Sequence, residues 1–390
     1  MNLPLSSKVT AMPRSPIREV MALANALPDV IHFEVGEPLE QTPAGIIEAA
    51  AAAARAGATK YVPNSGDIAL RRLIAERVSD RTGRAIDPKR VIVTTGAVGA
   101  LFTAVAASVE EGHELLVPDP GWPNYYAIGT LAGAQCIPYT LYPERGFEPD
   151  LVELERLITP TTRAILVNSP GNPTGAVLSA DTIAAIADMA QRHKLFVISD
   201  EIYEDMIFED RHASFANCDI DDQVWIISGC SKSFAMTGWR IGWVVAPAYA
   251  VDAAVGLQEP LVSCVAAPSQ AAAIAALGSF AEFPAQLCRT YRRRRDIVVE
   301  ELGNSGLLAT VPQGGFYALL DIGGFGIGST EAATSLIRDF KVALVPGRAF
   351  GPLSDRYLRL AFTTSDDDLR EGCRRIKAWA GPRLAARGSL

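Results

Sequence analysis

The sequence predicts an α/β fold, in which a large unit built on a mostly parallel sheet is followed by a smaller α+β unit. Short β-branched, apolar runs alternate with alanine-rich helical runs through the middle of the chain, which is typical of a buried parallel sheet. The pattern changes after about residue 280, where a long charged helix is expected. With 390 residues, 49% of them hydrophobic, the chain can fill a core of this size.

An alanine-rich run over 49–57 favours the first clear helix. Six apolar runs are then expected to form the strands of the large sheet: 90–95, 113–118, 163–168, 195–200, 224–229 and 241–246. The clearest helices between them cover 97–112 and 179–194, and Ser179 is the expected N-cap of the second.

The C-terminal part contains a charged helix to about residue 303, extended runs and a helical stretch near 330–340. We expect residues 1–45 to form an N-terminal arm and part of the small domain, 46–280 the large domain, and 281–390 the small C-terminal domain. In sheets of this kind, binding and catalytic side chains gather at the carboxyl ends of the parallel strands.

Composition argues against several classes of protein. The net charge of −8 disfavours a nucleic-acid binder, and the basic cluster at 291–302 is interpreted as a solvated helix face. The four histidines lack metal-ligand spacing, so no metal site is expected. No apolar run is long enough to span a membrane. The six cysteines form no CxxC pair, which fits a reducing, cytoplasmic location.

Residues 228–243, SGCSKSFAMTGWRIGW, place Lys232 among small residues and follow it with Arg240. A lysine on a surface helix normally has long polar neighbours that share its solvent, and this one does not. Small neighbours leave room for a ligand to approach the amine.

Two strand ends carry further polar side chains. The turn SPGNPTG (169–175) can hold the Asn172 amide in one place, although a plain tight turn explains it equally well. The segment SDEIY (199–203) puts Asp200 where a carboxylate needs a cation or a protonated ligand; taken alone, it would more often be a helix cap.

Two βα turns complete the set. The TTG turn at 94–96 precedes a helix, and the free N–H groups of such a turn form a natural phosphate seat. Trp122, in DPGWPNY, can stack on a flat ring or fill the core. Each of these signals is weak alone.

Together, the groups suit a phosphorylated, aromatic, nitrogen-containing cofactor held as a Schiff base, which is pyridoxal 5'-phosphate. Lys232 would form the imine, since an amine condenses with an aldehyde, and Arg240 would bind the phosphate bidentately. Asp200 would pair with the protonated ring nitrogen and keep the ring an electron sink. Tyr203 and Asn172 would hydrogen-bond the ring oxygen.

NSPGNPTG, SDEIY, SKSFAMTGWRIG and YLRLAF occur in this order, and together they resemble the class I/II aminotransferases, the fold-type I pyridoxal-phosphate enzymes of the aspartate aminotransferase superfamily. The resemblance runs from about Ile17 to the C-terminus. It implies a seven-stranded, mostly parallel sheet in the large domain, Lys232 as Schiff-base lysine and proton shuttle, and Trp122 stacked on the ring. It implies the same roles as above for Asp200, Tyr203, Asn172 and Arg240.

The resemblance also implies further site residues. The backbone around Ala97 and Val98 would contact the phosphate, and Arg359, in YLRLAF, would clamp the substrate α-carboxylate. The backbone of Gly36, in VGEP, would approach the same carboxylate. Tyr61, in KYVPNSG, would reach the phosphate of a neighbouring subunit, which implies a homodimer with shared active sites.

The chain departs from this family at one position. Many relatives carry a phosphate-binding serine three residues before the lysine, where this chain has Gly229. Ser228 and Ser231 flank that position, and either is a candidate substitute; Ser231 is the one included in the expected cofactor site. Ile17 is expected to contribute to the substrate pocket.

We expect an aminotransferase that moves an amino group between an L-amino acid and a 2-oxo acid by a ping-pong mechanism. The same fold supports C–S lyases and other elimination, cyclisation or oxidative reactions, and a cofactor-binding regulatory module is a third reading. No second arginine is identifiable as a clamp for a side-chain carboxylate, so the sequence leaves the amino donor open.

Overall fold

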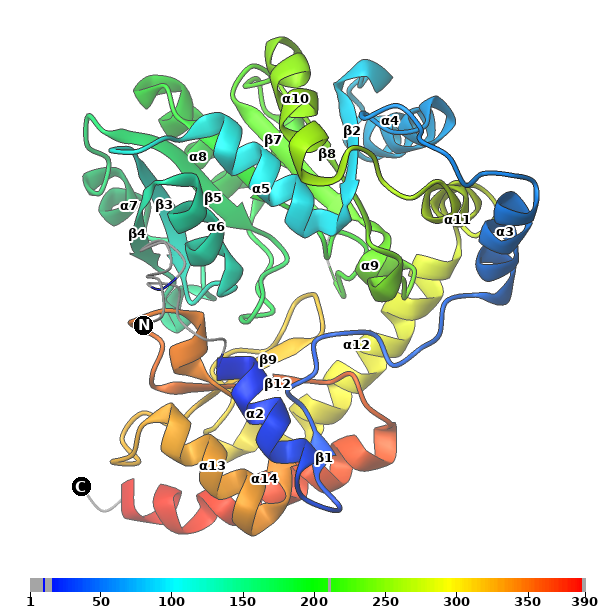
Figure 1. Cartoon of the computed structure of the whole chain (residues 1–390). Coiled ribbons are helices and arrows are strands. Elements are labelled where there is room, and N and C mark those ends of the chain that lie inside the picture. Colours follow the sequence, from blue (N-terminus) through cyan, green and yellow to red (C-terminus); the bar gives the residue numbers. More distant parts are fainter. Residues whose placement is uncertain (1–9, 11–15, 210–211, 388–390) are drawn as a thin grey trace, which may run out of the picture.

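The computed structural model describes residue 10, residues 16–209 and residues 212–387. Two units are visible in Figure 1, and the long helix α12 (Phe283–Leu302) runs between them. The N-terminal arm expected over 1–45 lies partly outside the described residues.

The large unit is built on a seven-stranded sheet, and the predicted fold class is confirmed. In spatial order its strands are β2 (Val91–Thr95), β8 (Ile241–Val245), β7 (Val224–Gly229), β6 (Phe196–Asp200), β5 (Thr162–Asn168), β3 (Glu114–Asp119) and β4 (Gln135–Thr140). All neighbouring pairs are parallel except those made by β8, which is antiparallel to both β7 and β2. The carboxyl ends of the six other strands therefore meet at one edge.

Six strands match the apolar runs in the sequence, and the seventh, β4, has no counterpart among them. β4 reads QCIPYT, which contains a glutamine and a proline. It pairs only with β3 and lies at the end of the sheet. An edge strand tolerates a residue without an N–H and a partly exposed surface, so its composition resembles that of a loop.

Helices cover both faces of this sheet (Figure 1). The helices of the large unit are α3 (Ala44–Arg55), α4 (Ile68–Thr82), α5 (Gly96–Ser108), α6 (Asn124–Ala132), α7 (Leu151–Arg156), α8 (Ala180–His193), α9 (Cys230–Ser233), α10 (Val251–Val262) and α11 (Ala267–Gly278), and α3 packs against α11. The predicted N-cap of α8 is confirmed, because Ser179 Oγ accepts a 3.2 Å hydrogen bond from the Thr182 N–H.

The smaller unit combines two short sheets with helices. β9 (Tyr317–Asp321), β12 (Tyr357–Ala361) and β11 (Val345–Pro346) form an antiparallel sheet. α13 (Ser329–Phe340) and α14 (Asp366–Arg387) pack in this unit together with α12. The N-terminal segment joins it, because β1 (Ile31–His32) pairs with β10 (Val342–Ala343) and α2 (Pro16–Asn25) lies beside α13 (Figure 1).

The basic cluster at 291–302 is only in part the solvated face that the sequence suggested, because Arg292 and Arg293 are exposed but the next two arginines are buried. Arg294 and Arg295 are 5% and 4% exposed. Arg294 forms a 3.0 Å ion pair with Glu40, and Arg295 donates to the Pro312 carbonyl and to Glu209. Apart from the adjacent Asp296, the acids that pair with these arginines come from distant segments, which a local charge count does not reveal.

Within the described ranges, no single helix is long and apolar enough to cross a membrane. The pair formed by 267–278 and 283–305 passes a length and composition test together, but it bends by 78° at its break.

Candidate active site

A cavity of about 440 Å³ lies at the edge of the large sheet where the parallel strands end, and the small unit contributes its other side. We call it the pocket. Of the residues that the sequence proposed for the site, those lining it are Ile17, Gly36, Ala97, Val98, Trp122, Asn172, Asp200, Tyr203, Ser231, Lys232, Arg240 and Arg359. Tyr61 is the proposed residue that lies elsewhere.

The sheet topology explains this convergence. Trp122, Asn172 and Asp200 follow or end β3, β5 and β6, and Lys232 lies on α9, directly after β7. Ala97 is in the first turn of α5, which follows β2. Because these strands run in the same direction, residues up to 135 positions apart meet at one edge.

The amine of Lys232 is held against the N-terminal segment. Its Nζ donates a 2.7 Å hydrogen bond to the Gly36 carbonyl oxygen. The pKa of Lys232 is lowered to about 8, chiefly by burial; the charges of Arg359 and Arg240 contribute to this shift, while those of Glu37 and Asp200 oppose it. A substantial neutral fraction of the amine therefore exists near neutral pH, as a nucleophile or a base requires.

Asp200 is a buried carboxylate, 3% exposed. Tyr125 Oη donates to its Oδ2 at 2.8 Å, and the Ile202 N–H donates to its Oδ1 at 3.2 Å. Burial raises the pKa of Asp200 to about 6, although these two hydrogen bonds counteract the shift. Tyr125 also packs edge-on against Trp122, with ring centroids 5.7 Å apart. The sequence analysis missed Tyr125, which the WPNY segment places on the turn of α6 nearest the pocket.

A cradle suited to an anion lies at the start of α5. Gly96 has a φ of +72°, and a Cβ there would lie 2.3 Å from Arg240 Nη2. Glycine is therefore required both by the backbone conformation and by the approach of the guanidinium. Arg240 donates from Nη1 to the Thr237 carbonyl at 2.7 Å. The helix N-terminus and this guanidinium bring positive charge to the same part of the pocket.

The structure distinguishes the two serines beside Gly229. Ser228 Oγ donates to Glu204 at 2.9 Å, and Ser228 does not line the pocket, whereas Ser231 does. A Cβ at Gly229 would lie 2.8 Å from the Ile241 carbonyl oxygen. The close approach of β7 to β8 thus leaves no room for a serine at this position.

Arg359 is a buried cation on β12, 2% exposed. Its guanidinium carbon lies 4.6 Å from the ring centroid of Tyr317 and 5.1 Å from that of Phe350. Nη2 donates to the Glu34 carbonyl oxygen at 2.7 Å, and Nη1 donates to Asn172 Oδ1 at 3.3 Å. Among the described residues, Nε has no hydrogen-bond partner. A buried guanidinium with spare donors can bind a carboxylate.

Tyr317 links the two units inside the pocket, and the sequence analysis missed it. Its Oη lies 3.0 Å from the Tyr203 Oη, and burial raises the pKa of Tyr203 well above 10. A Cβ at Gly36 would lie 2.5 Å from the Tyr317 Oη, so only glycine lets the backbone reach this hydroxyl and Lys232. The segment YALLD (317–321) has the pattern of an ordinary strand, so nothing in the sequence indicated that Tyr317 belongs to the site.

Tyr61 lies outside the pocket and is 89% exposed. Its expected role concerns a neighbouring subunit, so its position in a single chain is compatible with that expectation and does not test it.

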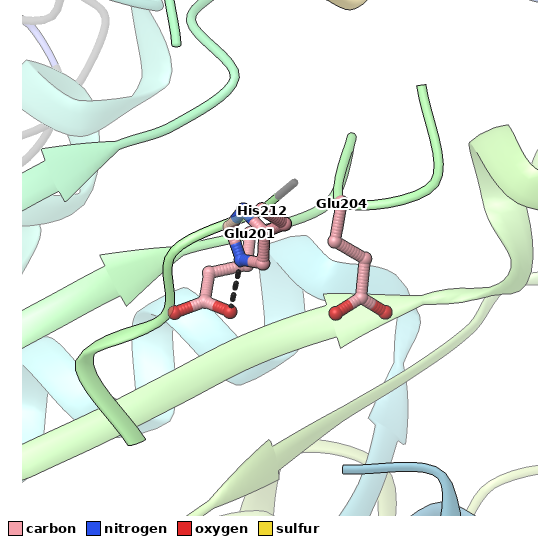
Figure 2. A group of neighbouring side chains, drawn as sticks. All are labelled: Glu201, Glu204 and His212. Atoms are coloured by element: carbon pink, nitrogen blue, oxygen red, sulfur yellow. Dashed lines mark hydrogen bonds and ion pairs between the residues drawn. The ribbon is translucent and has the colours of Figure 1, made fainter. Parts of the chain in front are cut away.

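A second cluster of polar side chains begins with the residue that follows Asp200 in the chain, and it is drawn in Figure 2. Glu201, Glu204 and His212 bring their ligand atoms within 4.8 Å of one another, an arrangement that the spacing of the sequence did not reveal. His212 Nε2 lies 2.7 Å from Glu201 Oε2, which is the dashed line in Figure 2. Glu204 forms a 2.7 Å ion pair with Arg81. These carboxylates thus already have cationic partners, and a nearby arginine opposes the binding of a metal ion.

The chain is similar to known proteins over most of its length. The profile of the family described as aminotransferase class I and II matches residues 28–376. An aspartate aminotransferase of Pyrococcus abyssi is 36% identical over 378 residues, which cover 96% of this chain and 97% of that protein. The arginine–pyruvate transaminase of Pseudomonas aeruginosa is 38% identical over 362 residues, 91% of each chain.

Solved structures show the same similarity. The aspartate aminotransferase of Thermus thermophilus with maleate superposes with a TM-score of 0.92 at 35% identity, covering 97% of this chain and 100% of that one. The match thus extends over both units. The chain belongs to the class I and II aminotransferase family, whose members use pyridoxal 5'-phosphate.

Proposed function

We propose that this aminotransferase binds pyridoxal 5'-phosphate in the pocket and moves an amino group between an L-amino acid and a 2-oxo acid. The observation that carries the proposal is the convergence of four groups on one cavity: the Lys232 amine, the Asp200 carboxylate, and the guanidinium groups of Arg240 and Arg359. Lys232 matches the aldehyde of the cofactor, Asp200 its ring nitrogen and Arg240 its phosphate. Arg359 matches the substrate carboxylate.

The residues present fit the cofactor. Arg240 and the N–H groups near Ala97 and Val98 would hold the phosphate, in the cradle that a side chain at position 96 would fill. Asp200 would hold the ring nitrogen, and a protonated partner would offset the cost of burying its charge. When bound, the cofactor supplies an electron sink for the carbanion that forms at the substrate α-carbon.

The remaining members of the expected site would orient the ring. Asn172 and Tyr203 line the pocket and would hydrogen-bond the ring oxygen, and Trp122 would offer an aromatic face to the ring. Ser231 is the better placed of the two candidate serines for a phosphate contact.

The chain's own groups account for the proton transfers. Arg359 binds the α-carboxylate and fixes the orientation of the α-carbon, with the Gly36 backbone beside it. The Lys232 amine, with a pKa of about 8, takes the α-proton and returns it at a neighbouring atom. Ile17 lines the same pocket and would contribute to the substrate site. One pocket serves both substrates in turn, so the kinetics are ping-pong.

We further propose a homodimer that shares active sites. The support is Tyr61, an aromatic side chain 89% exposed in the single chain, in a region where Ile68 is also 48% exposed. Sedimentation at micromolar concentration would test the assembly. Mixing inactive Lys232→Ala and Tyr61→Ala variants would test the sharing, since hybrid dimers regain one intact site.

Two other expectations remain proposals. We retain the division into residues 1–45, 46–280 and 281–390. We also propose a cytoplasmic location, which the six free cysteines support because a reducing compartment keeps thiols unpaired.

The decisive experiment is the visible absorption spectrum of the purified protein before and after single amino acids are added without a 2-oxo acid. Loss of the cofactor band, with release of one equivalent of the matching 2-oxo acid per site, is the expected result. Catalytic release of ammonia would instead favour an elimination or oxidative reaction. A colourless protein that does not take up the cofactor would refute the proposal.

A further inference from the structure

The charges of the pocket can be assigned one by one. Among the described residues that line it, the cations are Lys232, Arg240 and Arg359, and the acids are Glu34, Glu37 and Asp200. The proposed function assigns Lys232, Arg240 and Asp200 to the cofactor, and Arg359 to the substrate α-carboxylate. The two groups left for the substrate side chain are therefore both carboxylates.

Glu34 is the less satisfied of these two acids. It is 1% exposed, and its Oε1 lies 2.7 Å from His32 Nδ1. Its Oε2 is buried and has no hydrogen-bond partner among the described residues. Glu37, by contrast, accepts a 2.9 Å hydrogen bond from Thr237 Oγ1. A buried carboxylate oxygen without a donor is costly unless a ligand supplies one.

The position of Glu34 relates it to the substrate. Its backbone oxygen accepts the 2.7 Å hydrogen bond from Arg359 Nη2, and its carboxylate charge acts on the same guanidinium. Glu34 therefore lies next to the group that binds the α-carboxylate. A side chain that leaves the α-carbon on this side of the pocket meets Glu34.

Apolar side chains line the same pocket as Glu34. Ile17 and Met21 lie one turn apart on α2, so both project from the same face of this helix, and both line the pocket with Val35. An apolar wall with a carboxylate among its residues matches a side chain with a methylene stem and a cationic head.

We propose that Glu34 is a specificity-determining residue, and that the amino donor carries a guanidinium or ammonium group on an aliphatic stem. This inference rests on the proposed function, because it assigns the other charges of the pocket to the cofactor and the α-carboxylate. Donors with a side-chain carboxylate meet two acids and no free cation, so they react poorly.

The test uses the wild-type holoenzyme. It measures the rate at which the visible absorbance of the bound cofactor is lost when one amino donor at a time is added. Arginine and lysine are compared with citrulline, which is the neutral near-isostere of arginine, with norleucine and with glutamate. We expect kcat/KM for arginine or lysine to exceed that for citrulline by about 10-fold or more and that for glutamate by more.

Glu34→Gln sharpens the test, because it removes the charge and keeps the shape. We expect about a 10-fold loss of kcat/KM with the cationic donor and a change within about 2-fold with citrulline. Glu48→Gln, at an exposed position on α3, is the matched control for a general change of charge.

Two results would overturn the inference. One is a wild-type enzyme that prefers glutamate or aspartate to arginine and lysine, an outcome that needs no variant to fold. The other is a Glu34→Gln variant that loses the same factor with cationic and neutral donors. If no amino acid discharges the cofactor, the proposed function fails as well, and that outcome is distinct from a reversed preference.

Discussion

Two buried carboxylates occupy consecutive positions, Asp200 and Glu201, and their surroundings are opposite. Asp200 faces the pocket, where its hydrogen-bond donors are neutral and burial raises its pKa to about 6. Glu201 faces the other side of the strand, where His212 and two serine hydroxyls donate to it and its pKa is lowered. Burial opposes ionisation at both residues, and the partners decide the direction of each shift.

The difference separates function from stability. Glu201 forms an ion pair with His212 within the fold, so its negative charge stabilises the native state. Asp200 forms no such pair among the described residues, and the cost of its burial is relieved when a protonated ligand binds. Of two equally buried acids in SDEIY, the one left without a cation marks the active site.

Among the pocket residues, the largest loss of activity is expected from substitution of Lys232. Lys232→Ala removes the amine that holds the cofactor and moves the proton, so turnover should fall by at least about 1000-fold. The variant should still fold, since the lysine makes one hydrogen bond to a backbone carbonyl. Turnover assays and circular dichroism would check both parts. Normal activity would contradict the mechanism.

Asp200→Asn should have the next largest effect, and it should act in opposite directions on activity and stability. Turnover should fall by about 100-fold or more, because an amide does not keep the ring nitrogen protonated. The cofactor-free variant should be more stable than wild type by about 3 kcal/mol at pH 8, since the pKa of Asp200 is about 6 in the folded chain and 3.8 is its ordinary value.

The sign of this stability effect follows from proton binding. Between these two pKa values the folded state binds more protons than the unfolded state, so Asp200 lowers stability increasingly as the pH rises. The advantage of the variant should thus largely vanish at pH 4. Urea unfolding of both cofactor-free proteins at pH 8 and pH 4 would measure it, and a variant less stable at pH 8 would contradict the comparison.

Arg359→Ala tests the small-unit side of the pocket. Loss of the guanidinium should lower kcat/KM for amino donors by about 100-fold, mainly through KM, because the α-carboxylate loses its partner. The visible spectrum of the bound cofactor should not change. Steady-state kinetics with one donor and one acceptor would separate KM from kcat, and an altered spectrum would place the arginine at the cofactor instead.

Glu201→Gln should have the smallest effect on turnover and should act on stability. We expect a loss of about 1–3 kcal/mol near pH 7, because His212 keeps its buried position without a charged partner. Glu201 has a lowered pKa, so its contribution is lost as the pH falls through that value, and the two proteins should converge in acid.

His212 gives the complementary test of the same pair. Its pKa is raised by Glu201, so the stability due to its charge is present in mild acid and is lost as the pH rises through the raised pKa. His212→Gln should therefore be most destabilising below that pKa. Unchanged unfolding curves in both variants would show that the pair is unimportant.

Much of the site could be predicted because its residues follow strands with a clear apolar pattern. Asn172, Asp200 and Lys232 each lie at or just beyond the end of such a strand, and parallel strands bring their ends together. Glu34, Tyr125 and Tyr317 were missed, because each is an ordinary residue of its segment and becomes part of the pocket through contacts with distant segments. β4 was missed for a related reason, since an edge strand needs no apolar run.

The sequence by itself determined six of the seven strands of the large sheet, the turns that place polar groups at strand ends, and the set of groups that a phosphorylated pyridine ring requires. Local pattern suffices for these features, because periodicity and turn chemistry depend on neighbours along the chain. Only the tertiary structure decided which carboxylates have cations. Arg294 meets Glu40 and Arg81 meets Glu204, so the electrostatic state of a buried group depends on partners that sequence distance conceals.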